Sequence, residues 1–234
     1  MIVEASRAYS RGLIRGVARF QCEHQKWLLD YTTRGLDDPL PGWLSRWHGD
    51  GILARLNSRK MAKAVARRGV PVIDLRRAFS DLGLPSIGPD GSEIARIAYE
   101  HLRERGFTNF GFFGPPEGVH HELDQRAVSF LRYVREAGFV CDMFQSRSFR
   151  GGAGDSAPGP GTPKQILPFD GLMLELRRAS AMQWDRKLQS VVRWIRRLPK
   201  PVGVMVGNDD YGMLLINACR SAKVQIPEEV AIIG

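Results

Sequence analysis

The sequence predicts an α/β protein whose parallel sheets are covered by helices on both faces. Short apolar segments recur along the 234 residues, and most are followed by a segment with apolar side chains at helical spacing. Strands of such sheets are buried on both faces, so their sequences are continuous apolar runs rather than alternating ones. The 43% hydrophobic content is enough for one large core or for two lobes of ordinary size.

The first part of the chain contains a compact strand–helix–strand unit. The segments GILARL, SRKMAKAVARR and VPVIDL follow one another at residues 51–75. Before them we expect strands at 1–3 and 27–31, with helices at 10–21 and 41–47. After them a short strand is expected at 85–88. Short parallel strands joined by helices of this length are typical of doubly wound sheets.

The second part repeats this organisation. The segment 92–105 has Ile94, Ile97, Ala98 and Leu102 at helical spacing. We expect strands at 109–114, 140–144, 202–206 and 230–234, and helices at 124–138, 185–197 and 211–223. Gly106 follows the helix 92–105 as its C-cap and divides the chain into two similar halves. We therefore predict an N-terminal lobe at 1–106 and a C-terminal lobe at 107–234, with a cleft between them.

One stretch interrupts the pattern. Residues 151–162, GGAGDSAPGPGT, are dominated by Gly, Pro and Ala and cannot pack a core, so we expect a mobile surface loop. The chain also starts within an expected strand and ends as one finishes. This position of the ends favours a fragment of a longer protein.

Composition excludes several classes of protein. No run of 18 apolar residues exists, and the N-terminus has no apolar signal region, so we expect neither a membrane span nor secretion. Cys22, Cys141 and Cys219 are far apart and odd in number, and they fit no disulfide framework. We interpret them as small buried hydrophobes of a reducing compartment, and we expect a cytoplasmic protein. The net charge of +9 is compatible with nucleic acid nearby. Much of the excess lies on outer helix faces, where residues such as Lys187 and Arg193 fall mostly off the apolar stripe.

Polar side chains follow the expected strands, where ligands of open α/β sheets are held. They include Tyr9 and Arg11 after the first strand, Asp90 after the strand 85–88, and Arg126 on the helix after the strand 109–114. Asn208 and Asp209 follow the strand 202–206. Amides, carboxylates, guanidinium groups and an aromatic ring suit a small ligand rich in hydroxyls.

Each candidate also has a purely structural interpretation. Asn208 or Asp209 is the expected N-cap of the following helix, and Asp90 is another plausible cap. Arg126 can be a solvated surface charge. The adjacent His120 and His121 point apart and lack a third ligand at sensible spacing, so we expect no metal. Neither a nucleotide-binding glycine motif nor a nucleophile motif is present, so we expect no cofactor and no enzyme.

Five segments of the chain follow one another in a characteristic order: AYSRGLIRGVARF, GDGILARL, GVPVIDLR, IGPDGSEIARIAYEHLRERGFTNFGFFG and VGVMVGNDDYG…IPEEVAIIG. This series resembles the ligand-binding domain of lactose/galactose-repressor-like regulators. Within that family it is most similar to the xylose operon regulators. The resemblance covers nearly the whole chain outside the Gly/Pro-rich loop. It implies a type I periplasmic-binding-protein-like fold, with two doubly wound parallel-sheet lobes that close over a sugar.

The resemblance also implies roles for residues. Asp90, Arg126 and Asn208 occupy positions that contact the sugar in such relatives, and the loop Tyr9–Arg11 lies at the same cleft. Xylose regulators carry an AraC-type pair of helix-turn-helix motifs after this domain, and relatives form dimers. We therefore expect a small sugar, with a pentose favoured, as effector. We expect DNA contact only through a C-terminal domain beyond residue 234. We also expect the parent protein to be a homodimer.

The sequence departs from the family pattern at three places. It begins within the first strand, GPDG replaces the usual Asp-Asn pair at the turn with Asp90, and the C-terminal lobe is incomplete after AIIG. Two other functions stay open. A stand-alone sugar-binding protein for transport would need an export signal, and an α/β enzyme acting on a small sugar would need a nucleophile, metal or phosphate loop.

Overall fold

The computed structural model describes residues 1–24, 27–35, 38–77, 79–118, 120–144 and 181–234. It divides into two compact units, Met1–Gly88 and Pro89–Gly234. The predicted lobe boundary lay at residue 106, after helix α3 (Gly91–Glu104). In the structure α3 packs on helix α4 (His121–Glu136), so residues 89–106 belong to the second unit. The predicted loop 151–162 lies outside the described residues.

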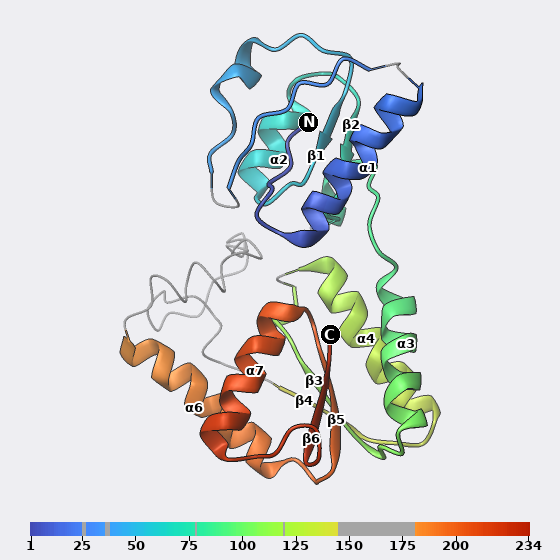
Figure 1. The fold of residues 1–234 in the computed structure, drawn as a ribbon, viewed down its shortest axis with the longest axis vertical. Coiled ribbons are helices and arrows are strands. Elements are labelled where there is room, and N and C mark those ends of the chain that lie inside the picture. Colours follow the sequence, from blue (N-terminus) through green and yellow to red (C-terminus); the bar gives the residue numbers. More distant parts are fainter. Residues whose placement is uncertain (25–26, 36–37, 78, 119, 145–180) are drawn as a thin grey trace, which may run out of the picture. The chain divides into compact units, whose positions relative to one another are not determined.

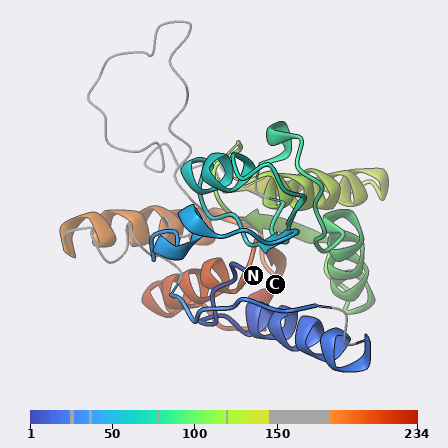
Figure 2. The same cartoon turned by 90° about the horizontal axis from the view of Figure 1, so that it is seen from above.

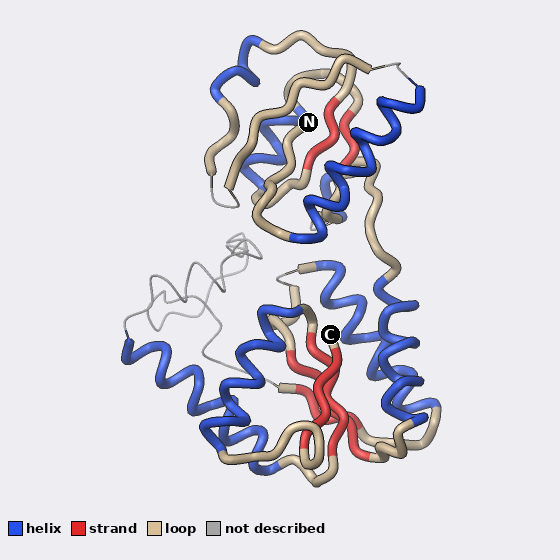
Figure 3. The backbone as a smooth tube through the Cα atoms, in the orientation of Figure 1, coloured by secondary structure: helices blue, strands red, loops and turns tan. Residues whose placement is uncertain are grey.

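The first unit is built on the parallel strands β1 (Ile52–Ala54) and β2 (Val72–Asp74). Single bridges extend this pair on both sides, from Ile2 to Ala54 and from Asp74 to Ser86. The expected strands at 1–3 and 85–88 are thus present only as isolated bridges. The helices are α1 (Ala8–His24) and α2 (Arg59–Ala66), with short 3-10 turns at Gly42–Arg46 and Ser80–Leu82. Figure 3 shows the two strands and their helices by type.

Helix α2 and helix α1 contribute to separate hydrophobic clusters of this unit. Met61, Ala62 and Val65 of α2 pack with Ile52 and Ala54 of β1, whereas the apolar residues of α1 pack with Met1, Val3 and Leu75. Ser58 begins α2 as its N-cap, because its hydroxyl accepts a hydrogen bond from the Met61 amide, at 3.2 Å.

The strand predicted at 27–31 is wrong. These residues have no strand conformation, Leu28 is 97% exposed and Trp27 is 46% exposed. Leu29 and Tyr31 pack against the cluster of Met1, Val3 and Leu75, and the Asp30 carboxylate accepts a hydrogen bond from the Trp47 indole, at 2.7 Å. The apolar composition of the segment predicted sheet burial, but no neighbouring strand pairs with it among the described residues.

The second unit contains a parallel four-stranded sheet in the order β4-β3-β5-β6. The strands are β3 (Asn109–Phe113), β4 (Cys141–Met143), β5 (Val202–Val206) and β6 (Val230–Ile233). Helices α3 and α4 pack together, and so do α6 (Ala181–Arg197) and α7 (Asp209–Ala222). The two pairs cover opposite faces of the sheet (Figure 1), and α6 and α7 lie side by side in Figure 2 as well.

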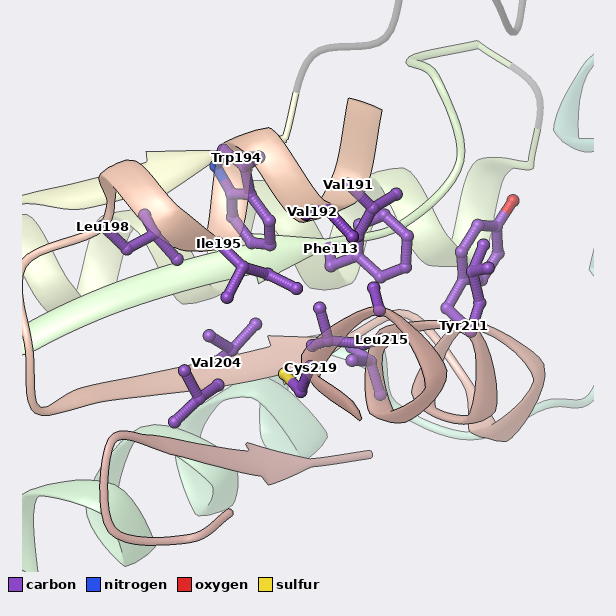
Figure 4. Packing of buried hydrophobic residues seen from close by; sticks show 14 of the residues in the cluster. Phe113, Val191, Val192, Trp194, Ile195, Leu198, Val204, Tyr211, Leu215 and Cys219 are labelled. Carbon is purple, nitrogen blue, oxygen red and sulfur yellow. The ribbon is translucent and has the colours of Figure 1, made fainter. Parts of the chain in front are cut away.

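Alternate side chains of the strands supply the two cores of this unit. Phe110, Phe112 and Met205 pack against α3 and α4, and Phe113 and Val204 pack against α6 and α7. Figure 4 shows the second core, in which Phe113 lies between Trp194 of α6 and Tyr211 of α7. A strand buried on both faces explains why β5 is apolar throughout. The predicted α/β class with parallel sheets is therefore confirmed.

Two further findings concern the surface. The predicted apolar stripe of the helix 185–197 is confirmed, because Val191, Val192 and Ile195 are buried. Lys187 was expected to lie mostly off the stripe, but it is buried, at 9% exposure. In the part of the chain that the structure describes, none of the helices has the length and apolar character that crossing a bilayer requires.

Candidate functional site

The candidate residues of the second unit lie after the carboxyl ends of strands or at the starts of helices. Asp90 precedes α3, Arg126 lies in the second turn of α4, and Asn208 links β5 to α7. Parallel strands end at the same edge of a sheet, so the β3–α4 and β5–α7 turns are neighbours.

Asp90 is the N-cap of α3. Its Oδ1 accepts hydrogen bonds from the backbone amides of Ser92, at 2.9 Å, and Glu93, at 3.2 Å. The capping interpretation is therefore confirmed. The cap uses one carboxylate oxygen, and the side chain is exposed. Oδ2 is thus an acceptor that a ligand hydroxyl can use without disturbing the helix.

Asn208 caps α7 in the same way. Its Oδ1 accepts a hydrogen bond from the Tyr211 amide, at 3.1 Å, so the predicted cap is Asn208 rather than Asp209. The cap leaves Nδ2 as a donor for a ligand. Asp209 is the first residue of α7 and is exposed. Its negative charge is stabilised there by the helix dipole, whether or not it contacts a ligand.

Arg126 connects these groups. Its Nη1 donates a hydrogen bond to the Gly207 carbonyl oxygen, at 2.9 Å, directly before Asn208. On the other side Arg126 contacts the start of α3, because a Cβ at Gly91 would lie 3.2 Å from the Arg126 Cγ and 3.3 Å from the Glu122 carbonyl oxygen. Only glycine allows this approach without displacement. The structure thus brings Asp90, Arg126 and Asn208 into one region of the second unit.

Tyr9 and Arg11 belong to the first unit, at the start of α1. The Arg11 Nη1 donates hydrogen bonds to the carbonyl oxygens of Ala5, at 3.1 Å, and Ser6, at 2.9 Å. Arg11 therefore holds the loop that precedes α1. The Tyr9 ring is 47% exposed, and the Arg55 guanidinium carbon lies 5.4 Å from its centroid.

Two polar clusters lie at the ends of the first-unit strands, and sequence reasoning missed three of their members, Ser10, Arg55 and Asn57. In one, Arg55 pairs with Glu4 and with Ser10. In the other, Arg76 donates a hydrogen bond to the Asn57 side chain, and Asp74 accepts from the Leu56 and Arg76 amides at 3.3 and 3.0 Å. For Arg55 and Asn57 the sequence signal was position alone, since they are the first and third residues after β1. Nothing local distinguishes them from surface residues.

Burial raises the pKa of the Asp74 carboxyl, although the backbone hydrogen bonds and the Arg76 charge act in the opposite direction. This carboxylate links the ends of β1 and β2, because it accepts from the Leu56 amide after β1 and from the Arg76 amide after β2. Among the described residues no group of three or more His, Cys, Asp or Glu side chains is arranged to hold a metal ion.

Comparisons with known proteins support this assignment of fold. A family model described as a periplasmic binding protein-like domain matches residues 164–234. The xylose operon regulatory protein of Escherichia coli K12 is 22% identical over 242 residues, which cover 100% of this chain and 53% of that protein. Its counterpart in Haemophilus influenzae Rd is 20% identical over 243 residues. The chain thus spans about half the length of the curated relatives it matches.

Solved structures agree. A structure described as a xylose-binding transcription activator superimposes with a TM-score of 0.71 and 20% identity, covering 100% of this chain and 52% of that one. A LacI-family regulator from Enterococcus faecalis V583 with bound ribose gives a TM-score of 0.61 and 16% identity, with 100% and 74% coverage. The protein therefore has the periplasmic-binding-protein-like α/β fold, shared with xylose operon and LacI-family regulators.

Proposed function

We propose that this chain is the ligand-sensing domain of a sugar-responsive transcription regulator, and that Tyr9, Arg11, Asp90, Arg126, Asn208 and Asp209 contact one small sugar. D-xylose is the first candidate, because relatives over the whole chain are xylose operon regulatory proteins. Binding is reversible and shifts the population between two conformations of the protein, by no more than the difference in affinity for the two.

The observation that carries the proposal is the grouping of Asp90, Arg126 and Asn208. Each of the two caps uses one polar atom for its helix and has a second available to a ligand. The guanidinium group between them is held by the Gly207 carbonyl oxygen. A carboxylate acceptor, an amide donor and a guanidinium donor together match the alternating donors and acceptors of a sugar.

The remaining parts of the proposal concern the complete protein. Output on DNA requires a helix-turn-helix domain C-terminal to this one, and we propose that the parent acts as a cytoplasmic homodimer. The relatives are regulatory proteins by description, which favours a sensor over an enzyme or a transport protein.

The test is a thermal-shift titration of the full-length protein with D-xylose, D-ribose and D-glucose. At a sugar concentration of about 100 times Kd, binding adds about 2.7 kcal/mol to the free energy of unfolding and raises Tm. We expect a pentose to produce this shift in the wild-type protein. If no sugar of the panel changes Tm, the sensor proposal is wrong.

Two variants locate the site. Arg126→Ala removes the guanidinium donor, and Asn208→Asp retains the Oδ1 cap while removing the amide donor; each is expected to abolish most of the pentose-induced shift. Arg132→Ala is the matched control, since Arg132 is an exposed arginine on the same helix α4. A full pentose response in both site variants would show that the sugar binds elsewhere.

A further inference from the structure

Arg55 lies at the centre of a buried polar cluster in the first unit. It directly follows β1, and its backbone amide donates a hydrogen bond to the Ile2 carbonyl oxygen, at 2.9 Å. Its Nη1 pairs with the Glu4 carboxylate and also donates to the Ser10 hydroxyl. Ser10 in turn donates to the same Glu4 oxygen, at 2.6 Å. Arg55 therefore forms one closed network with two residues that lie 51 and 45 positions before it in the sequence.

This network is fixed by burial. Glu4 is 1% exposed and Ser10 is fully buried. A guanidinium that meets a carboxylate and a hydroxyl through one nitrogen has little rotational freedom left, and charge-assisted hydrogen bonds of this type are among the strongest in proteins. Arg34, also buried, interacts electrostatically with Glu4 and Asp38, so the surrounding charges are balanced. The orientation of Arg55 is thus set before any ligand arrives.

Arg55 also contacts the ring of the candidate ligand residue Tyr9. The guanidinium carbon lies 5.4 Å from the centroid of the Tyr9 ring, and that ring is 47% exposed. The Arg55 side chain keeps 13% exposure. Because the polar contacts with described residues are made by Nη1, the second terminal nitrogen, Nη2, remains as a donor beside the aromatic face.

We infer that Arg55 is a further sugar-binding residue that donates a hydrogen bond from Nη2 to one sugar hydroxyl, while Glu4 and Ser10 act as its positioning residues. The inference rests on the proposed function and deepens it. An aromatic ring that covers the C–H side of a sugar leaves the hydroxyls at the rim of the ring, where a neighbouring guanidinium reaches them. Arg55 then reads the position of one hydroxyl and contributes to the choice among neutral pentoses.

The experiment measures Kd of the full-length protein by calorimetry for D-xylose and its monodeoxy analogues, or for the pentose with the largest thermal shift and its analogues. Arg55→Met is expected to weaken binding of the parent sugar by about ten-fold to one hundred-fold, the effect of one hydrogen bond from a charged donor. It should cause no further loss for the single analogue that lacks the contacted hydroxyl. A purely structural role would weaken binding of every analogue by the same factor, and that result would overturn the inference.

Controls separate folding from binding. Arg55→Met leaves the Glu4 carboxylate buried without its partner, so the double variant Glu4→Gln, Arg55→Met removes both charges and is expected to show the same analogue pattern. Arg59→Met is the matched control, because Arg59 pairs with Asp81 and lies 5.3 Å from the Phe79 ring in the same unit. Its Kd should stay within about two-fold of wild type, as expected for an exposed ion pair.

The outcomes distinguish the two proposals. If the wild-type protein binds a pentose and Arg55→Met binds it equally well, this inference fails and the sensor proposal stands. The double variant serves for this comparison if the single variant does not fold. If the wild-type protein binds no sugar of the panel, both fail. If Arg55→Met loses affinity for every sugar that retains one particular hydroxyl, and for no other sugar, Arg55 is the residue that binds this hydroxyl.

Discussion

The side chains of Asp90 and Asn208 each have two polar atoms, one that caps a helix and one that can contact a ligand. Oδ1 of each caps a helix, and the second polar atom remains available. The capping role follows from local sequence, because a short polar side chain before an amphipathic segment predicts an N-cap. The ligand role cannot be separated from it by sequence alone. Substitutions that keep the cap and change only the second atom, such as Asn208→Asp, are therefore more informative than alanine.

The three cysteines differ sharply in environment. Burial raises the pKa of the Cys141 thiol to about 12 and that of Cys219 to about 11, whereas Cys22 is exposed on α1. The thiolate is the reactive form, so a raised pKa lowers the reactive fraction at a given pH. The sequence interpretation of all three as small buried hydrophobes is wrong for Cys22, whose helix has most of its surface in solvent.

We predict that iodoacetamide at pH 7.5 alkylates Cys22 of the native protein first. The shift from 9.0 to about 11 alone lowers the Cys219 thiolate fraction by about a hundred-fold. Mass spectrometry of the alkylated peptides gives the rates, with urea-unfolded protein as control. Equal rates at the three cysteines in native protein would contradict the burial of Cys141 and Cys219.

The same shifts affect stability. Both thiols bind their protons more tightly in the folded state, so their contribution to stability is complete below pH 9.0, the ordinary value, and is lost as the pH rises toward the raised values.

At the scale of elements, close contact between helix and sheet depends on a glycine. Gly203 is the second residue of β5, and a Cβ there would be 2.8 Å from Cδ2 of Leu102 in α3. Leu102 is itself buried. The helix therefore rests on the strand where the strand has no side chain, which helps seat α3 and with it the Asp90 cap.

We predict that Gly203→Ala lowers the free energy of unfolding by about 1–3 kcal/mol, because the added methyl group displaces Leu102. Gly16→Ala is the matched control in α1, where nothing lies within 4 Å of the added Cβ. It should stabilise the protein by about 0.5–1 kcal/mol through helix propensity. Urea denaturation measures both, and a neutral Gly203→Ala would contradict this packing of α3.

At the scale of the whole molecule, the proposed function assigns candidate ligand residues to both units. The first unit has its own hydrophobic clusters and the polar network around Arg55, and the second has the grouping of Asp90, Arg126 and Asn208. A ligand that contacts residues of both units must stabilise both units. The reason is that binding to the native state suppresses every local unfolding that would break the binding site.

We predict that a saturating pentose slows amide hydrogen exchange in the loop before α1 and in the β5–α7 turn together. Amide exchange in peptides from the C-terminal turns of α6 should not change, which provides an internal control. Peptide-resolved exchange with and without the sugar measures this. Protection confined to one unit would show that the six candidate residues do not share a ligand.

The sequence by itself determined the α/β class, most helices and the strands of the second unit. Continuous apolar runs and helical periodicity depend on neighbouring residues, and so does the cap at Asn208. Tertiary structure alone decided that residues 27–31 lie outside the sheet, that Arg126 reaches the Gly207 carbonyl oxygen, and that Glu4, Ser10 and Arg55 meet. The physical reason is that local pattern sets the conformation of a segment, whereas the order of strands sets which distant side chains become partners.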